Sequence, residues 1–309
     1  MPYHHHCLVY DDDAELAPVA RGVMESVWRG DHVVVAVDER TAAVLAPLCD
    51  LGVATRLDPD TTSPAATLHR YRQLFDRLLD ERSAPINVVG LVPARTRQQW
   101  TRWARYEAVV NVALAHYPLT GLCLYDRRFT AENIVDELMK THPCMWGSSS
   151  CGPSSHYVEP VHYLADHLPE HRLQPDRPAD AMVEEPTPLT ARHCLEALMS
   201  DRTDARTGLN LEIALSEVVT NAVVHGAPPI TMRCWLEPTS IVCAVTDSGP
   251  GVSDPLTGWL PPVDPLALGG GRGLWAARQI TDDLTIVSHP GDCTVTFTAS
   301  LPPIRPIPN

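Results

Sequence analysis

The sequence predicts an α/β fold class with two domains, the first of which contains a mainly parallel sheet. Its 309 residues are enough for two separate cores. Apolar, β-rich runs alternate with helical patterns before residue 150, and a proline-rich stretch then separates them from a second group of motifs. We therefore expect domains at residues 1–150 and 186–309, joined by a connector at residues 151–185.

Strands and helices are expected in alternation along the first domain. Buried strands are predicted for the apolar runs Val33 to Val37, Ile86 to Val92 and Leu119 to Tyr125. Helices are predicted where apolar residues recur at helical spacing, from Leu68 to Arg82 and from Arg97 to Ala115. Strands that alternate with helices favour a parallel sheet.

The connector is predicted from its prolines, which are densest between Pro153 and Pro188 in a segment that also carries several acidic residues. Proline withholds a backbone donor and disfavours helix in the residue before it. The stretch is therefore expected to be loosely packed.

Charge and composition limit which partners and which cellular compartment are expected. The formal net charge is −14, which predicts no direct binding to nucleic acid or to an anionic membrane. No stretch approaches the roughly 20 apolar residues of a membrane span, so a cytoplasmic protein is expected. The nine cysteines are odd in number and scattered, which argues against a disulfide framework.

No phosphate-binding loop follows the first predicted strand, so the first domain is not expected to perform the chemistry itself. Its short motifs are His6 and Tyr10, Arg105-Tyr106-Glu107 with Asn111, Gly121-Leu122-Cys123-Leu124-Tyr125-Asp126, and Thr141-His142-Pro143. Over roughly residues 4 to 146 these motifs resemble the MEDS sensory domains that are fused to bacterial signalling kinases. The resemblance implies a degenerate α/β ATPase-like fold that binds a small-molecule ligand or another signal.

A ligand pocket is one interpretation of the polar residues in those motifs. Glu107 and Asn111 are four residues apart and share a helix face, while Cys123, Tyr125 and Asp126 fall where a strand is expected to end. The alternative is structural: a solvated Glu107, a buried Cys123 and an Asp126 that caps the next helix.

A metal site is a second hypothesis for the first domain. His142, Cys144, Cys151 and His156 are close in sequence and are ligand types that suit zinc or iron. The run from His4 to Cys7 is another such cluster, although a short histidine run can simply be exposed. Neither cluster has the paired cysteine spacing that is typical of zinc sites.

The second domain begins its motifs with a helix, LEIALSEVVTNAVVHG, from Leu211 to Gly226. Glu217, Asn221 and His225 recur at four-residue steps beside an apolar stripe. A neutral Asn and His among Val and Ala are a poor composition for a solvated face. An amide oxygen suits Mg²⁺, and a glutamate one turn earlier suits proton abstraction, so Asn221 and Glu217 are candidates for these roles.

Two glycine-containing segments follow. In VCAVTDSGPG a β-rich run delivers Asp247 to a strand end, and Gly249 and Gly251 permit unusual backbone conformations. The segment from Gly269 to Gly273, GGGRG, then precedes a helical pattern, where free amides and Arg272 suit phosphate. Residues 252–268 between them are rich in Pro, Gly and Asp, which suits a mobile lid. Each segment alone is also typical of an ordinary turn or hinge.

In this order, over about residues 190–302, the three segments resemble the N, G1 and G2 boxes of the GHKL superfamily, and anti-sigma factor kinases in particular. The resemblance implies an α/β sandwich of the Bergerat type, with helices on one face of a mixed sheet. It implies that Glu217 is the general base, that Asn221 holds Mg²⁺ and that Asp247 binds adenine. It assigns the remaining nucleotide contacts to Gly249, Gly251, Gly271, Arg272, Gly273, Leu274 and, on the last strand, Thr294.

An anti-sigma factor serine/threonine kinase is the function that this resemblance favours. Such a kinase would use Mg·ATP, bind a sigma factor and phosphorylate an antagonist (anti-anti-sigma) protein. A sensor histidine kinase is the alternative, but it needs a dimerising hairpin, and His193 is the only histidine between the connector and the first box. An ATP-dependent sensory module without phosphotransfer is a third hypothesis, and a homodimer stays open.

Overall fold

The computed structural model describes residues 3–56, 63–94, 97–147, 151–167, 174–199, 202–261, 272–289 and 291–302. The chain divides into two compact units, Met1–Asp166 and His167–Asn309. Each unit has its own sheet and its own core of buried apolar side chains.

Unit 1 is built on a seven-stranded sheet in the order β3-β2-β4-β5-β1-β6-β7. Pairing is parallel except between β6 and β7, which confirms the predicted mainly parallel sheet. The strands are β1 His4–Tyr10, β2 His32–Ala36, β3 Thr55–Arg56, β4 Ile86–Gly90, β5 Leu119–Asp126, β6 Cys144–Trp146 and β7 Cys151–Pro153.

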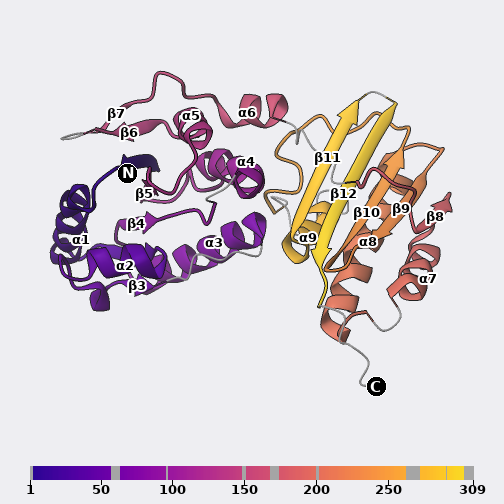
Figure 1. The fold of residues 1–309 in the computed structure, drawn as a ribbon, viewed down its shortest axis with the longest axis horizontal. Helices are drawn as coiled ribbons and strands as arrows, with labels where there is room; N and C mark the ends of the chain where they lie inside the picture. The colour runs from indigo at the N-terminus through magenta and orange to yellow at the C-terminus, as the bar shows by residue number, and fades with distance from the viewer. Residues whose placement is uncertain are drawn as a thin grey trace. The chain divides into compact units, whose positions relative to one another are not determined.

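Helices connect these strands, as expected for parallel neighbours (Figure 1). They are α1 Ala17–Arg29, α2 Glu39–Leu45, α3 Pro64–Glu81, α4 Arg97–Ala113, α5 Glu132–Thr141 and α6 Pro160–Asp166, with short 3-10 helices η1 Asp13–Leu16 and η2 Leu51–Val53. The ends of α1 show how the sequence sets their limits: a proline lies in its first turn and Gly30 ends it in the left-handed region at φ 78°.

Strand β1 holds the central place that the sequence analysis did not predict. It lies between β5 and β6, with His5 opposite Gly121 and Cys7 opposite Cys123. Because side chains alternate along a strand, His5 is buried and His4 is exposed. The histidine run is therefore part of the sheet and not an exposed segment.

Unit 2 has a five-stranded sheet in the order β11-β12-β10-β9-β8, with α7, α8 and α9 on one face (Figure 1). Its strands are β8 Ala181–Glu184, β9 Thr231–Leu236, β10 Ser240–Asp247, β11 Asp283–His289 and β12 Asp292–Ser300, and its helices are α7 Pro188–Met199, α8 Ala205–His225 and α9 Arg272–Ile280. This layered arrangement confirms the predicted α/β sandwich.

All four strand pairings of this sheet are antiparallel, so the expectation of a mixed sheet is wrong. The connections explain the difference. Only residues 237–239 separate β9 from β10, and residues 290–291 separate β11 from β12. Connections this short can join only antiparallel neighbours.

The two faces of the unit 2 sheet are covered differently. The helical face carries the main core, in which Leu215 and Val218 of α8 meet Phe297 of β12. On the opposite face Trp235 and Val242 pack with Ala179, which precedes β8. The segment before β8 is thus part of the fold of unit 2.

Residues 151–185, expected to form a loose connector, contain β7, α6 and β8. The prolines occupy positions that these elements tolerate, since Pro153 ends β7 on a sheet edge and Pro160 begins α6. The first half belongs to unit 1 and the second half to unit 2.

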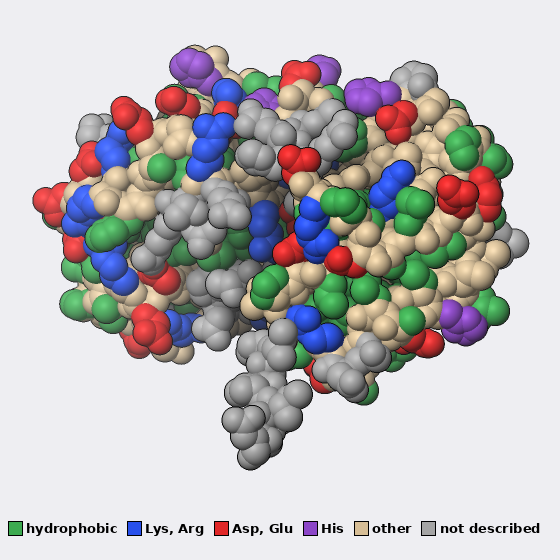
Figure 2. Space-filling model, turned by 45° about the vertical axis from the view of Figure 1, so that its right-hand side comes forward, with side chains coloured by type: hydrophobic (Ala, Val, Ile, Leu, Met, Phe, Trp, Pro, Cys, Tyr) green, Lys and Arg blue, Asp and Glu red, His purple; other side chains and the backbone are tan. Residues whose placement is uncertain are grey.

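The surface is charged with both signs on the face that Figure 2 shows. On the face drawn in Figure 2, acidic and basic side chains lie scattered among one another. None of the described helices combines the length and the apolar character that crossing a bilayer requires.

Candidate functional site

Helix α8 presents the first set of candidate residues in unit 2. Asp204 caps its start by accepting hydrogen bonds from the amides of Arg206 and Thr207. Glu217 and Asn221 lie one turn apart and are both half-buried, whereas His225 is exposed at the last turn. The face that carries Glu217 and Asn221 is therefore partly enclosed by the rest of the unit, unlike a solvated face.

The end of α8 meets the end of β10 through glycines. A Cβ atom placed on Gly226 would lie 2.4 Å from Cγ of Asp247, and one on Gly249 would lie 2.6 Å from Cα of Gly226. Asp247 is buried, and its Oδ1 accepts a hydrogen bond of 2.8 Å from the amide of Gly249. Only glycine allows such close contact, so the first two predicted segments are held against each other.

The start of α9 meets α8 in the same way. A Cβ atom on Gly273 would lie 2.5 Å from Oε2 of Glu217, so the carboxylate of Glu217 points at the first turn of α9. Leu274 anchors that turn in the core, while Arg272 is exposed. Gly271 lies outside the described residues, so its predicted role stays a prediction.

Gly251 is held against β11. Its φ of +79° lies in the left-handed region, and a Cβ atom there would meet Oγ of Ser288 at 2.1 Å. The same hydroxyl accepts a hydrogen bond of 2.7 Å from the amide of Val252. This contact fixes the first residues of the predicted lid, whose later residues 262–268 lie outside the described part of the chain.

Thr294 lies beside Thr246 in the β10–β12 pair, and their hydroxyls are 2.9 Å apart. Asp247 is the next residue on β10, opposite Cys293. Thr294 therefore neighbours the strand end that carries Asp247, as its predicted place near the adenine requires.

These residues fit a nucleotide with its metal. Glycines at 226, 249 and 273 let α8, the end of β10 and the start of α9 approach one another closely, which brings the candidate residues together. Asp247 offers a buried carboxylate, Asn221 a neutral oxygen, and Arg272 with the first turn of α9 a positive charge and free amides.

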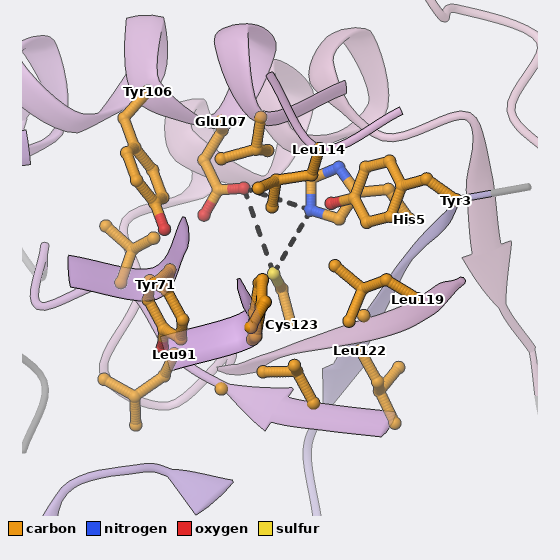
Figure 3. A pocket seen from close by; sticks show the side chains of 16 residues that line it. Tyr3, His5, Tyr71, Leu91, Tyr106, Glu107, Leu114, Leu119, Leu122 and Cys123 are labelled. Atoms are coloured by element: carbon orange, nitrogen blue, oxygen red, sulfur yellow. Dashed lines mark hydrogen bonds and ion pairs between the residues drawn. The ribbon is translucent and has the colours of Figure 1, made fainter. Parts of the chain in front are cut away.

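Unit 1 contains a pocket between its sheet and helices α3 and α4 (Figure 3). Its empty volume is about 470 Å³, a figure that counts the open solvent at its mouth. Leucines, valines and four aromatic side chains (Tyr3, Tyr71, Phe75 and Tyr106) line most of it, and Glu107, His5 and Cys123 form one polar wall. Such a lining suits an apolar ligand with one polar group.

The polar wall belongs to a buried cluster around Glu107, whose side chain is fully buried. Oε2 of Glu107 lies 3.3 Å from Nε2 of both His5 and His142. Its other oxygen, Oε1, accepts a hydrogen bond of 2.8 Å from the hydroxyl of Tyr125. Cys123 completes the cluster, with Sγ 3.3 Å from Nε2 of His5.

Burial governs the protonation of this cluster. Desolvation and the neighbouring His142 lower the pKa of His5 to about 4, so its imidazole is neutral near pH 7. Burial alone would raise the pKa of the Glu107 carboxyl, but the two histidines outweigh it and hold that pKa below its usual range. Burial, with the nearby Glu107 charge, raises the pKa of the Cys123 thiol.

The structure divides the residues predicted for one ligand pocket. Glu107, Asn111, Cys123 and Tyr125 belong together, because Asn111 bonds to His5 and Tyr125 to Glu107. Asp126 does not join them, since it pairs with Arg40 and Arg128 instead. Alternation along β5 directs Asp126 to the other face of the sheet.

The four predicted zinc or iron ligands do not form one group. Cys144 and Cys151 are joined in a disulfide across the β6–β7 pair, which corrects the expectation that structural disulfides are absent. His142 is buried beside Glu107, and His156 is exposed and contacts Ser155. Closeness in sequence failed as a guide because β6 and the end of α5 direct these side chains to different places.

Sequence reasoning missed the role of His5. The signal available was the run His4–Tyr10, whose Cys-Leu-Val-Tyr end is typical of a strand and would place His5 and Cys7 on one face. A strand in the middle of a sheet brings its buried side chains to helices distant in sequence, here α4.

Comparison with known families matches both units. Residues 4–143 match the family described as "MEDS: MEthanogen/methylotroph, DcmR Sensory domain". Residues 185–299 match the "Histidine kinase-like ATPase domain". One match covers a sensory domain and the other an ATPase domain, each over less than half of the chain. The chain thus combines a MEDS domain with a GHKL-type, histidine kinase-like ATPase domain.

Several solved structures resemble unit 2. A mycobacterial sensor histidine kinase, MprB, is 17% identical over 40% of this chain and 99% of its own, with a TM-score of 0.27. The RsbU and RsbW domains of Rv1364c from Mycobacterium tuberculosis are 21% identical over 41% of this chain and 34% of their own, with a TM-score of 0.30. No curated protein matches the chain. The domain assignment rests on the two families.

Proposed function

We propose that this chain is an anti-sigma factor serine/threonine kinase whose MEDS domain senses a small molecule. In this proposal unit 2 binds Mg·ATP and a sigma factor, and it phosphorylates a hydroxyl of an antagonist protein. The observation that supports it most directly is the contact between Gly273 and Glu217, which aims a carboxylate at the helix start where phosphates would bind.

Each side chain of the site has a task that its position supports. The Glu217 carboxylate accepts the proton of the substrate hydroxyl, and the Asn221 amide oxygen is a metal ligand one turn away on α8. Asp247 accepts a hydrogen bond from the exocyclic amine of adenine, with Thr294 on the neighbouring strand. Arg272 and the amides of Gly273 and Leu274 hold phosphate oxygens.

When bound, Mg·ATP supplies the transferred phosphoryl group and the cation that neutralises its charge. Phosphoryl transfer requires mainly positioning and electrostatic stabilisation from the protein. One carboxylate, one metal-binding amide and a set of backbone amides are therefore sufficient for the chemistry.

The segment before α8 favours a serine/threonine kinase over a histidine kinase. Between residues 174 and 204 the described part of the chain contains β8 and the 12-residue helix α7, which carries His193. Helix α7 contributes Ala191 and Leu195 to the core of unit 2. A helix committed to that core does not resemble half of a dimerising hairpin.

The sensory part of the proposal rests on the cavity beside Glu107. Its apolar lining and single polar wall favour a small, mostly apolar ligand with one hydrogen-bonding group. Binding there would contact His5, Glu107 and Cys123 together.

The test is to incubate the full chain with labelled ATP and candidate antagonist proteins, then treat the products with acid. Phosphoserine and phosphothreonine survive acid, whereas phosphohistidine is lost. We expect acid-stable label on an antagonist and none on the kinase. Acid-labile label on the chain itself, abolished by His193→Gln, would establish a histidine kinase instead. ATP binding without any phosphoryl transfer would support the third hypothesis, an ATP-dependent sensory module.

A further inference from the structure

Four potential metal ligands converge in the interior of unit 1. They are His5 of β1, Glu107 of α4, Cys123 of β5 and His142 at the end of α5, and their donor atoms all lie within 4.8 Å of one another. Three of them are fully or almost fully buried, with His5 at 4% exposure and Glu107 and His142 at 0%. The cluster is therefore assembled from distant parts of the chain in the interior of unit 1.

Four of the six distances between the donors are close to the edges of a tetrahedron around one ion. Zinc bonds of about 2.1 Å to nitrogen or oxygen place two such donors about 3.4 Å apart, and a sulfur bond of about 2.3 Å widens that edge to about 3.6 Å. Both histidine Nε2 atoms lie 3.3 Å from Oε2 of Glu107. Sγ of Cys123 lies 3.3 Å from Nε2 of His5 and 3.9 Å from Oε2 of Glu107.

Hydrogen bonds outside the cluster turn the lone pairs of both histidines inward. Nδ1 of His5 donates to Oδ1 of Asn111 at 3.1 Å, and Nδ1 of His142 donates to the carbonyl of Leu138 at 3.0 Å. Each ring therefore presents an unprotonated Nε2 to the cluster. Metal-bound histidines in proteins are oriented by such second hydrogen bonds.

The orienting groups are themselves fixed. The amide nitrogen of Asn111 donates to the carbonyls of Glu107, Ala108 and Thr141, which settles that Oδ1 faces His5. The hydroxyl of Tyr125 donates to Oε1 of Glu107 and leaves Oε2 for the cluster.

One atom of the cluster is buried without a well-formed hydrogen bond. Nε2 of His142 lies 3.3 Å from Oε2 of Glu107 but makes no hydrogen bond of good geometry among the described residues, although the ring is fully buried. An unsatisfied buried nitrogen carries a desolvation penalty. A cation at the centre of the cluster would remove that penalty and offset the buried carboxylate.

We propose that unit 1 binds one zinc ion through Nε2 of His5, Oε2 of Glu107, Sγ of Cys123 and Nε2 of His142. Two imidazoles, a carboxylate and a thiolate in a tetrahedron favour zinc over the hard cations, which take oxygen ligands. Cys123 loses its thiol proton to solvent on binding. The site is independent of the proposed kinase activity and replaces the ligand set predicted from the sequence.

The ion would stand at the polar wall of the cavity. His5, Glu107 and Cys123 line that cavity as well as the cluster (Figure 3). The small molecule proposed for this domain would then lie against three zinc ligands, so zinc would shape the polar end of the pocket.

A second group, His6 with Cys144 and Cys151, provides the natural comparison. Its two sulfurs are joined in a disulfide, so they are not available as thiolates. His6 also accepts a hydrogen bond from Nε1 of Trp146 at 3.2 Å. Substitutions in this group serve as controls of the same residue types in the same domain.

The experiment measures zinc in the full chain, purified without an affinity tag after growth with added zinc. We expect about one zinc per chain, retained in His6→Ala and in Cys144→Ser. His142→Ala and Cys123→Ser are expected to lose it. For Asn111→Ala, which removes only a positioning group, we expect a zinc affinity about 10–100-fold weaker in chelator competition.

If a variant does not fold, the unaltered chain can be tested by replacing its zinc with cobalt, whose absorption spectrum reports the ligands. The cobalt form of the unaltered chain should show intense tetrahedral bands and a thiolate-to-metal charge-transfer band. Three results would overturn the proposal: no stoichiometric zinc in the unaltered chain, a cobalt form without the thiolate band, or zinc lost from His6→Ala or Cys144→Ser but kept in Cys123→Ser.

Discussion

Glu217 is the side chain on which the proposed chemistry depends most. Glu217→Gln keeps the shape of the side chain and removes its basic oxygen. As general base, Glu217 contributes roughly a hundredfold to ten-thousandfold to the rate, so transfer should fall by that factor while ATP affinity stays the same. Phosphoryl transfer and nucleotide binding are measured separately, by label on the antagonist and by calorimetry.

A matched control lies on the same helix. Glu212 is also half-buried on α8, but five residues earlier, which turns it to another face. Glu212→Gln should leave the transfer rate unchanged. Equal effects of the two substitutions, or normal transfer by Glu217→Gln, would remove Glu217 from the mechanism.

Gly251 allows the cost of a left-handed backbone to be separated from the cost of a contact. Gly251 and Gly291 have φ values of +79° and +82°, but only Gly251 has a close neighbour, Oγ of Ser288. Gly291→Ala should lower the free energy of unfolding by roughly 1–2 kcal/mol through backbone strain. Gly251→Ala should lower it by about 1 kcal/mol more, because Ser288 must turn away from the amide of Val252.

Denaturant unfolding of both variants with and without Ser288→Ala checks this expectation. In the Ser288→Ala background the extra effect of Gly251→Ala should disappear, since the hydrogen bond is already lost. If the extra effect persists there, the hydrogen bond of Ser288 does not hold the start of the lid.

Local sequence patterns identified some of the candidate site residues and missed others. Asp247, Gly249 and Gly273 could be recognised because each is required by its own turn or helix start, and glycine's tolerance is visible in the sequence. His5 could not be assigned to Glu107, because the contact depends on β1 pairing with β5 more than a hundred residues later. Asp126 was predicted to join the pocket residues, but side chains alternate along a strand and Asp126 therefore lies on the opposite face of the sheet from Tyr125.

At the scale of elements, the segment before β8 is the part that the sequence analysis undervalued. Arg177 pairs with Asp180 and Glu237, and its carbonyl accepts the indole hydrogen bond of Trp235 at 2.9 Å. Ala179 covers the same tryptophan. Proline content indicated a loose connector, yet these contacts hold the segment against the sheet.

A pair of fragments tests the role of this segment. The free energy of unfolding should be about 1–3 kcal/mol lower for a fragment of residues 181–309 than for a fragment of residues 167–309. The shorter fragment lacks the carbonyl that accepts the hydrogen bond of the buried Trp235 indole. Both should bind Mg·ATP if they are compared below their unfolding temperatures. Equal denaturant midpoints would mean that residues 174–180 contribute nothing to the stability of unit 2.

Strands β2, β4 and β5 of unit 1 were predicted to within a few residues, since continuous valine and isoleucine runs are typical of buried parallel strands. The antiparallel pairing of the unit 2 sheet was not predicted. The expectation of a mixed sheet came from the family resemblance and not from the sequence of unit 2 itself. The short turn at residues 237–239 would have indicated a hairpin.

For the whole molecule, we expect unit 1 to control the chemistry without taking part in it. Removing residues 1–166 should leave ATP binding and transfer measurable, because the described candidate residues of the nucleotide site all belong to unit 2. The response of the transfer rate to small apolar molecules added to the full chain should be absent from the fragment. Side-by-side transfer assays with and without such molecules provide the measurement.

The control for this comparison is a folded fragment, verified by its circular dichroism. Complete loss of transfer in that fragment would show that unit 1 contributes to the reaction. An unchanged response to the added molecules would place their binding outside the MEDS domain.

The central position of β1 also affects how the protein is made. On the ribosome β1 emerges before its partners, and Thr120 of β5, which lies opposite His4, follows 116 residues later (120 − 4). At about 5–20 residues per second, the apolar half of β1 waits roughly 6–23 s for β5 to be synthesised. Overproduction should therefore yield more soluble protein when chaperones that shield apolar strands are abundant.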